Sequence, residues 1–316
     1  MAQKDLTAKK LEAHTDIFAT IFNALLFEEK LIDPHNLSLA PTEEFVEATD
    51  GTTRSLIRDM AMKYSDGNED NYFGLAILGA ENQSLPDEYA PIRIMGYDYG
   101  NYREQIDRHK SKKRELRDLI NVANTDNVKT FLQTELAKLD EFSITPAITI
   151  ILNFSKKSWT TNKSLLDMVK NPNNRFSRWM RDYPIYVFDM CDLTNEQICR
   201  LEGDFKEIAK IFTYGNEANI RTNGLKYPLD TLDFLIAHKN EQSYISARKR
   251  IADMEKKGDV ITMGTLVDEL ERNKAIEDAK NFIKNGGPEG IVIKTLADGL
   301  HIAEEEAAEI FVKEVK

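Results

Sequence analysis

A short apolar run that ends in a carboxylate constrains this chain more than any other stretch. Residues 73–78 are mostly apolar, Gly79 and Ala80 follow, and Glu81, Asn82 and Gln83 come before a turn. This pattern predicts a buried strand. Side chains alternate along a strand, so Glu81 and Gln83 share one face. A carboxylate at the end of a buried strand is costly unless it has a charged partner or binds a metal ion.

A second carboxylate, Asp59, lies one element upstream, in residues 52–63, which we expect to form a strand. If the two segments pair as a hairpin, Asp59 and Glu81 converge on one cation. Mg²⁺ takes oxygen ligands, and these two carboxylates and the main-chain carbonyl of Asn82 would supply them, with Mn²⁺ as a substitute. Gln83 would orient an attacking water through its amide.

A structural role is the alternative for these residues. Glu81 would then form a salt bridge with Arg58 or Arg93, and Gln83 would cap a turn. Other kinds of site have weaker support, because the chain has no GxxxxGK[ST] loop, no GxGxxG after a strand and no GxSxG elbow. Its five histidines lack the spacing of a metal site.

Charge and cysteine content limit the classes of protein that fit. A net charge of −11 over 316 residues argues against broad, charge-driven binding to nucleic acid or membranes, but not against an enzyme with a local basic surface. The sequence has no run of 18 apolar residues, so we expect no membrane partner. Cys191 and Cys199 fit neither a zinc site nor a disulfide framework, so we expect reduced cysteines and a cytoplasmic protein.

Hydrophobic periodicity predicts the remaining elements. We expect helices at residues 6–30, 128–140 and 194–211, and two interior strands at residues 146–154 and 183–190. Beyond residue 215 the chain becomes mostly helical and charged, with glycines between the last two helices. Residues 291–310 faintly resemble a helix-turn-helix, although an oligomerising or capping helical region fits better.

The most basic window spans residues 103–117 and follows three tyrosines. Its acidic residues favour a solvated helix face with mixed-sign pairs. The sharper interpretation is a phosphate-contacting surface near the active site. Its DNA-binding candidates are Tyr102, Arg103, Lys110, Lys112 and Lys113.

Several segments together resemble the Rpn family of recombination-promoting nucleases, often labelled putative transposases, within the PD-(D/E)XK nuclease superfamily. The resemblance covers roughly residues 5–215. It is carried by an opening helix (residues 14–18 and 23–27), by residues 40–43, and by an Asp after an Arg (58–59) followed by residues 63–64. It is also carried by a strand that ends in Glu-Asn-Gln (78–83), by the start of a helix (91–98 and 102–105), and by a later strand (149–154) followed by Trp159.

The resemblance implies an α/β fold with a restriction-endonuclease-like mixed sheet flanked by helices. The domains would be a nuclease-like core at residues 1–215 and a mostly helical extension at residues 216–316. The extension lies outside the resemblance, and its helical pattern makes it the expected site of any homo-oligomer contact. Carried over by position, Asp59 and Glu81 would be metal ligands, and Gln83 would stand where the superfamily usually has lysine. A neutral amide cannot supply the charge of that lysine to a developing phosphorane.

The implied function is Mg²⁺-dependent DNA cleavage linked to recombination or mobile elements, in which in-line attack by water leaves a 5′-phosphate. The net charge of −11 and Gln83 favour the alternative. In that alternative the chain is a catalytically weak nuclease-fold module that binds DNA or another protein.

Overall fold

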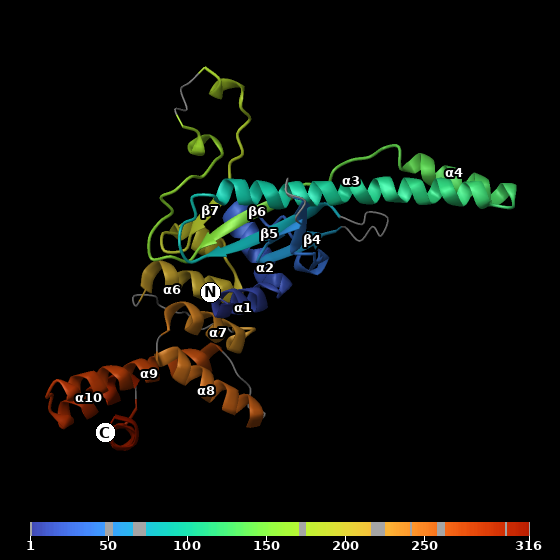
Figure 1. Ribbon diagram of the computed structural model, residues 1–316. Helices are drawn as coiled ribbons and strands as arrows, with labels where there is room; N and C mark the ends of the chain where they lie inside the picture. The colour runs from blue at the N-terminus through green and yellow to red at the C-terminus, as the bar shows by residue number, and fades with distance from the viewer. Residues whose placement is uncertain are drawn as a thin grey trace. The chain divides into compact units, whose positions relative to one another are not determined.

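A computed structural model describes residues 2–47, 53–65, 74–170, 175–215, 225–240, 242–257, 263–300 and 302–315 (Figure 1). Contacts between residues divide the chain into two compact units. Residues 18–194 form the sheet unit, and residues 1–17 with 195–316 form the helical unit. The contacts therefore group the chain differently from the expected division after residue 215, which stays a prediction about domains.

The sheet unit contains a five-stranded mixed sheet with the order β1-β4-β5-β6-β7, so the chain has an α/β fold. β1, β4 and β5 are antiparallel, whereas β5, β6 and β7 are parallel. Parallel strands need a long crossover, and two helices make it between β5 and β6. The strands and the crossover helices are β1 Leu37–Leu39, β4 Met60–Tyr64, β5 Ala76–Gln83, α3 Ala90–Val122, α4 Asp126–Lys138, β6 Ala147–Asn153 and β7 Tyr186–Asp189.

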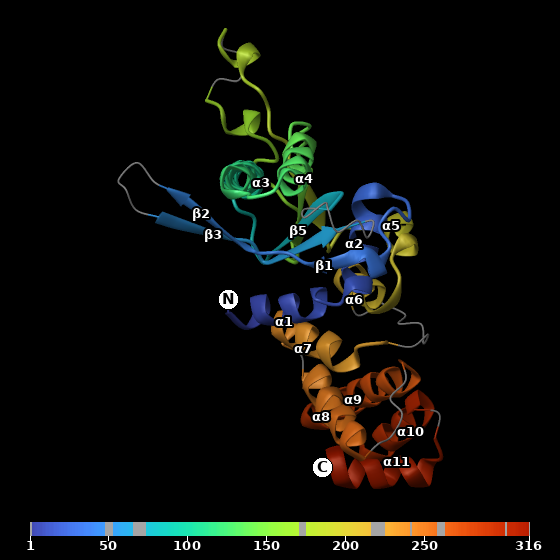
Figure 2. The same cartoon turned by 90° about the vertical axis from the view of Figure 1, so that its right-hand side faces the viewer.

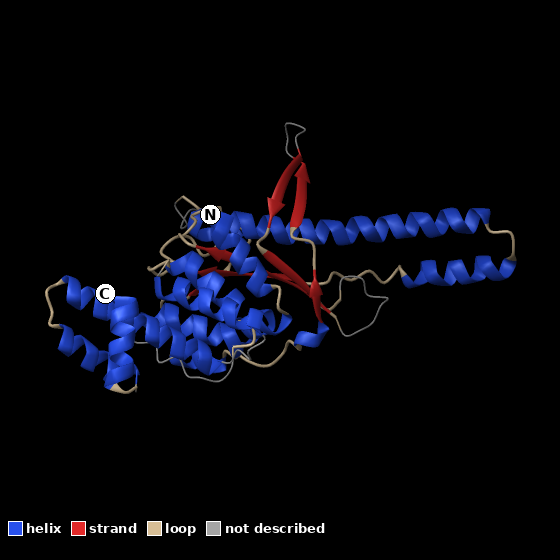
Figure 3. Cartoon of the chain, turned by 90° about the horizontal axis from the view of Figure 1, so that it is seen from below, coloured by secondary structure: helices blue, strands red, loops and turns tan. Residues whose placement is uncertain are grey.

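Helices cover both faces of this sheet. α3 lies on one face, and the part of α2 (Thr15–Ile21) that belongs to the sheet unit lies on the other (Figures 1 and 2). Under α3, Ile94 and Tyr97 form a buried cluster with Ile151 of β6 and with Trp159. β2 (Glu43–Glu47) and β3 (Thr53–Ile57) form a separate antiparallel pair, visible as a red hairpin in Figure 3.

Three expected elements differ from the structure in extent or in position. The strand expected at residues 52–63 is two strands in different sheets, because the chain turns at Arg58 and Asp59 between β3 and β4. The second strand expected in the interior is β7, which ends the sheet and leaves Tyr186 half exposed. The helix expected at residues 194–211 is α5 (Asn195–Arg200) and α6 (Gly203–Tyr214), separated where Gly203 takes a positive φ of 57°.

The long first helix is also interrupted. α1 (Ala2–Glu12) ends in a tight turn, in which the His14 main-chain N–H donates to Leu11, and α2 starts at Thr15. α2 continues as a π-helix (Phe22–Phe27), which stops where Glu28 takes a left-handed φ of 59°. The polar turn expected at residues 65–71 lies outside the described residues from residue 66 onward.

The helical unit has its own buried core between its last helices, in a region that the sequence predicts only to be helical and charged. Ile276, Leu296 and Phe311 are among its fully buried side chains. Its described helices after α6 are α7 Pro228–Lys239, α8 Gln242–Lys257, α9 Met263–Lys284, α10 Glu289–Leu300, α11 Glu304–Ile310 and a π-helix at Phe311–Val315. None of the described helices is both long enough and apolar enough to cross a membrane.

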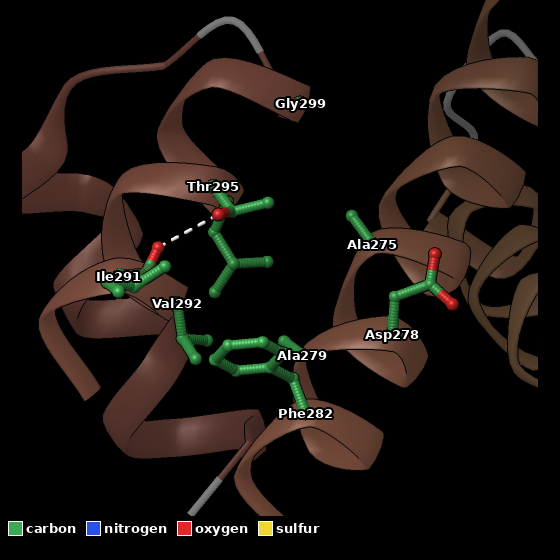
Figure 4. Close-up of a pocket in the computed structure, with 9 residues that line it drawn as sticks. Ala275, Asp278, Ala279, Phe282, Ile291, Val292, Thr295 and Gly299 are labelled. Carbon is green, nitrogen blue, oxygen red and sulfur yellow. Dashed lines mark hydrogen bonds between the residues drawn. The ribbon is translucent and has the colours of Figure 1, made fainter. Parts of the chain in front are cut away.

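Glycines end α9 as the sequence indicates. Gly286 has a φ of 83°, its N–H donates to the carbonyl of Ile283, and the N–H of Gly287 donates to Phe282. These two bonds are a Schellman motif, which satisfies the last carbonyls of a helix. The Phe282 ring then lies across an apolar pocket of about 360 Å³ between α9 and α10, with Asp278 at one side (Figure 4).

Candidate active site

The pairing of β4 with β5 brings the two predicted carboxylates together. Met60 lies opposite Ala80 in the antiparallel register, so the preceding Asp59 lies beside Glu81. The main-chain N–H of Asp59 donates to Glu81 Oε1 at 3.0 Å. In return, the main-chain N–H of Asn82 donates to Asp59 Oδ2 at 2.8 Å. The expected pairing of the two segments is therefore confirmed, and each carboxylate is held by the other's strand.

Burial and like charge both act on Glu81. Its side chain is almost fully buried, with 3% of the residue exposed. Burial first, and then the neighbouring Asp59 carboxylate, raise the pKa of Glu81 to about 7, against the opposing effect of Arg93. A buried carboxylate next to a second one has little reason to be ionised at neutral pH without a cation. Strongly perturbed acids of this kind cluster at functional sites.

Arg93, near the start of α3, provides one such cation. Its guanidinium lies 3.6 Å from Glu81 Oε2 and 2.6 Å from Asp87 Oδ2. The pairing with Glu81 is the one that the structural alternative predicts for Arg93. The distance of 3.6 Å is longer than a hydrogen bond, however, so the tighter bond to Asp87 fixes the guanidinium.

Asn82 and Gln83 extend the site along β5. The main-chain carbonyl of Gln83 accepts from Phe154 on the β6 side at 2.7 Å. Main-chain groups alternate in direction along a strand, so those of Asn82 point the other way, toward Asp59. Gln83 shares the face of Glu81, under the start of α3, and is half-buried. Among the described residues, no side chain forms a hydrogen bond with the Gln83 amide.

The donor set fits a hard divalent cation with few protein ligands. No group of three or more His, Cys, Asp or Glu side chains able to hold a metal occurs in the described ranges. Two adjacent carboxylates and the Asn82 carbonyl on the same side are nevertheless a set that Mg²⁺ accepts when substrate phosphate and water complete it. The raised pKa of Glu81 points the same way, because a cation would relieve the repulsion that Asp59 exerts.

A second buried cluster was not anticipated from the sequence. Arg58, of which only 1% is exposed, lies 3.5 Å from Asp98 on α3 and packs its guanidinium over the Tyr97 ring. Asp98 also accepts hydrogen bonds from Thr149 and from the Tyr183 hydroxyl. Among the described residues Arg58 pairs with Asp98 and forms no salt bridge with Glu81, although its charge still lowers the pKa of Glu81. Gly79 on β5 leaves the space that the Arg58 side chain occupies.

The candidate DNA-binding residues lie on α3 and have mixed surroundings. Tyr102 faces inward, where its hydroxyl accepts from the Ala147 N–H at 3.3 Å. Arg103 forms an ion pair with Asp107 at 2.9 Å, and Lys113 forms one with Asp140 at 2.6 Å. Lys110 and Lys112 are exposed. The pairs match the solvated helix face that the acidic residues favour, and a role in DNA binding stays a prediction.

No family model, no curated protein and no solved structure matches the chain.

Proposed function

We propose that the chain is a metal-dependent DNA endonuclease of the Rpn type that hydrolyses phosphodiester bonds on a restriction-endonuclease-like sheet. One observation carries the proposal: Asp59 and Glu81 hold each other through main-chain hydrogen bonds at the end of a buried strand pair. A salt bridge would need only one acid, whereas two adjacent acids favour a cation. The link to recombination or mobile elements rests on the family resemblance.

Asp59, Glu81 and the Asn82 carbonyl would hold Mg²⁺ or Mn²⁺. A bound ion of this kind polarises the scissile phosphate and makes water a better nucleophile. Gln83 lies on the same face as Glu81 and would orient the attacking water through its amide. The amide adds no positive charge, so a slow rate is expected from this residue alone.

Arg93 is the residue of this chain that would supply that charge. Asp87 holds its guanidinium at 2.6 Å, so the cation is already oriented beside Glu81. A fixed cation stabilises charge that develops on a phosphoryl group, because little reorganisation is needed during the reaction. Sequence reasoning had considered Arg93 only as a structural partner of Glu81.

The alternative is a catalytically weak nuclease-fold module that binds DNA or another protein. Two features favour it: the ion pair of Arg93 with Glu81, which partly neutralises the site, and the amide at Gln83. In this case DNA or protein binding would persist without cleavage. The helical unit would then be the place to look for a homo-oligomer.

Plasmid nicking in the presence of Mg²⁺ or Mn²⁺ tests the proposal. We expect the wild type to nick supercoiled DNA and the Asp59→Ala and Glu81→Ala variants to lose this activity. Glu104→Ala, on the outer side of α3, is the matched control and should nick normally. Equal nicking by all four proteins would reveal a contaminant or another site. Binding without nicking in any of them would favour the alternative.

A further inference from the structure

The chain makes a long excursion between β6 and β7, and its neck is well defined. Ser164 bridges to Pro184 in an antiparallel manner. The Ile185 N–H donates to Lys163 at 2.8 Å, and the Leu165 N–H donates to Tyr183 at 3.2 Å. These bonds close the base of the excursion, which rises from the sheet in Figure 1 as a yellow-green loop. The excursion is therefore anchored at its base.

The neck is fixed next to the candidate active site. β5 and β6 are parallel, and Gln83 pairs with Asn153, so the excursion leaves the sheet at the edge that carries Glu81. Just before the neck, Thr161 donates to the Asp87 carbonyl at 3.2 Å, and Asn162 donates to the Glu88 carbonyl at 2.9 Å. Asp87 is the residue that holds Arg93. The base of the excursion therefore lies at the same edge of the sheet as the carboxylate pair, and a ligand bound to the excursion would approach the pair from that edge.

The described part of the excursion beyond its 3₁₀ turn at Leu166–Met168 carries cations alternating with aromatic rings. We name residues 175–181 the arginine–aromatic segment. Phe176 is 68% exposed and Trp179 is 76% exposed. The guanidinium of Arg175 lies 4.9 Å from the Phe176 ring centre, and that of Arg178 lies 5.2 Å from the Trp179 ring centre.

Ion pairing among the described residues does not account for the arginines of this segment. Arg175, Arg178 and Arg181 form no ion pair with a described residue, although the chain as a whole carries a net charge of −11. A tryptophan that served the core would be buried, as Trp159 is, and a large exposed aromatic costs free energy in water. Three cations and two exposed rings within seven residues are the chemistry that binds single-stranded nucleic acid, through phosphates and stacked bases.

We propose that the arginine–aromatic segment is a nucleic-acid contact, in which Trp179 and Phe176 stack on unpaired bases and the three arginines contact the phosphates. The inference rests on the proposed function, because it names the DNA strand at the active-site edge as the ligand. It also assigns the substrate contact to this segment rather than to the basic window on α3. Unpaired bases are the target because a base inside a duplex does not expose its face for stacking.

Tryptophan fluorescence tests the stacking directly in the full-length protein. The chain has two tryptophans, and Trp159 is buried, so the difference between the wild type and Trp179→Phe reports Trp179. We titrate a thymidine oligonucleotide in EDTA, which prevents cleavage. Quenching of the Trp179 signal is expected. Because this residue is exposed, its replacement leaves the fold intact, and a signal unchanged by saturating oligonucleotide would overturn the proposal.

Affinity and its salt dependence separate the two parts of the segment. Phe176→Ala with Trp179→Ala should weaken oligonucleotide binding by about tenfold for each ring. Replacing the three arginines with glutamine should lower the slope of log K against log salt by roughly 0.7 for each phosphate that an arginine neutralises. The triple arginine-to-lysine variant should keep that slope. Phe131→Ala on α4, where the ring is also exposed, is the matched control and should bind normally.

The outcomes separate this inference from the proposed function. If the segment variants bind the oligonucleotide normally while nicking still requires Glu81, the nucleic acid binds elsewhere and only this inference fails. If the variants no longer bind while nicking does not depend on Glu81, the proposed active site fails and the inference about the segment stands. Binding of the wild type to anionic phosphatidylserine vesicles, with no affinity for the oligonucleotide, would overturn the inference in favour of a membrane surface.

Discussion

The most informative single change is Glu81→Gln, which removes a charge and keeps the shape of the side chain. In the wild type, burial and the Asp59 carboxylate raise the pKa of Glu81 to about 7 from an ordinary value of 4.5. The amide does not ionise, and its oxygen can still accept the hydrogen bond from the Asp59 main chain. The variant therefore isolates the electrostatic cost of holding this carboxylate in a buried place.

The sign and size of the effect follow from proton linkage. Because the pKa of Glu81 is higher in the folded protein than in the unfolded chain, the folded state binds more protons between pH 4.5 and about 7. The free energy of unfolding of the wild type is then highest below pH 4.5, with respect to this group, and decreases as the pH rises through 7. The decrease amounts to about 3 kcal/mol. Glu81→Gln should not show it, so at pH 8 without metal the variant should be the more stable protein.

Urea unfolding followed by circular dichroism, at pH 5 and pH 8 in EDTA, measures this difference. Glu104→Gln on α3 is the control for an acid-to-amide change, and it should follow the wild type. Mg²⁺ at a hundred times its dissociation constant should return about 2.7 kcal/mol to the wild type at pH 8 and nothing to Glu81→Gln. If the wild type and Glu81→Gln lose equal stability between pH 5 and pH 8, the reasoning about Glu81 is refuted.

Three further changes probe the surroundings of the site and the helical unit. Arg93→Met should raise the pKa of Glu81 further and reduce nicking by roughly 100-fold, and a normal rate in this variant would remove the proposed role of Arg93. Arg108→Met, which breaks a surface pair with Glu104, is the control and should leave both unchanged. Gly79→Ala should destabilise the sheet unit by about 2 kcal/mol in urea unfolding, because a Cβ there would lie 2.6 Å from the Arg58 side chain; unchanged stability would mean that Arg58 moves freely. Ile291→Glu at the apolar pocket should lower the mass seen by light scattering if the helical unit mediates a homo-oligomer, and an unchanged mass above 36.2 kDa would place the oligomer interface elsewhere.

Local patterns predicted the elements whose signals are local. β6 is rich in β-branched residues and is a buried interior strand between β5 and β7, as expected. The glycines after α9 likewise correspond to a real helix end, and the described residues from Pro228 onward are mostly helical, as expected. α4 lies within two residues of its expected bounds.

The errors have a common physical cause. Residues 52–63 have enough strand propensity for one strand, but the burial of Arg58 against Asp98 forces a break that only the tertiary structure determines. The apolar residues of β7 are typical of an interior strand. Its position as an edge strand depends on the crossover from β6, which the sequence of β7 does not show. Propensity is a weak guide wherever a distant contact decides.

The candidate site shows the same limit. The sequence predicted that Asp59 and Glu81 would meet, because a strand end and a neighbouring acid are visible in it. It named Arg93 only as one of two possible salt-bridge partners of Glu81, and it did not predict that Asp87 holds the guanidinium, because these residues come together only when α3 packs on the sheet. The structure contains both the carboxylate pair of a cation site and the guanidinium of a salt bridge, so a measurement of metal binding decides between the two roles.

Counting the Mn²⁺ ions bound to the full-length chain at pH 8, by electron paramagnetic resonance of the free ion, addresses that choice without relying on activity. We predict one bound ion per chain in the wild type and in Glu104→Gln, and none in Asp59→Asn or Glu81→Gln. Binding that is equal in all four proteins, or absent from the wild type at millimolar Mn²⁺, would contradict a metal site at the carboxylate pair.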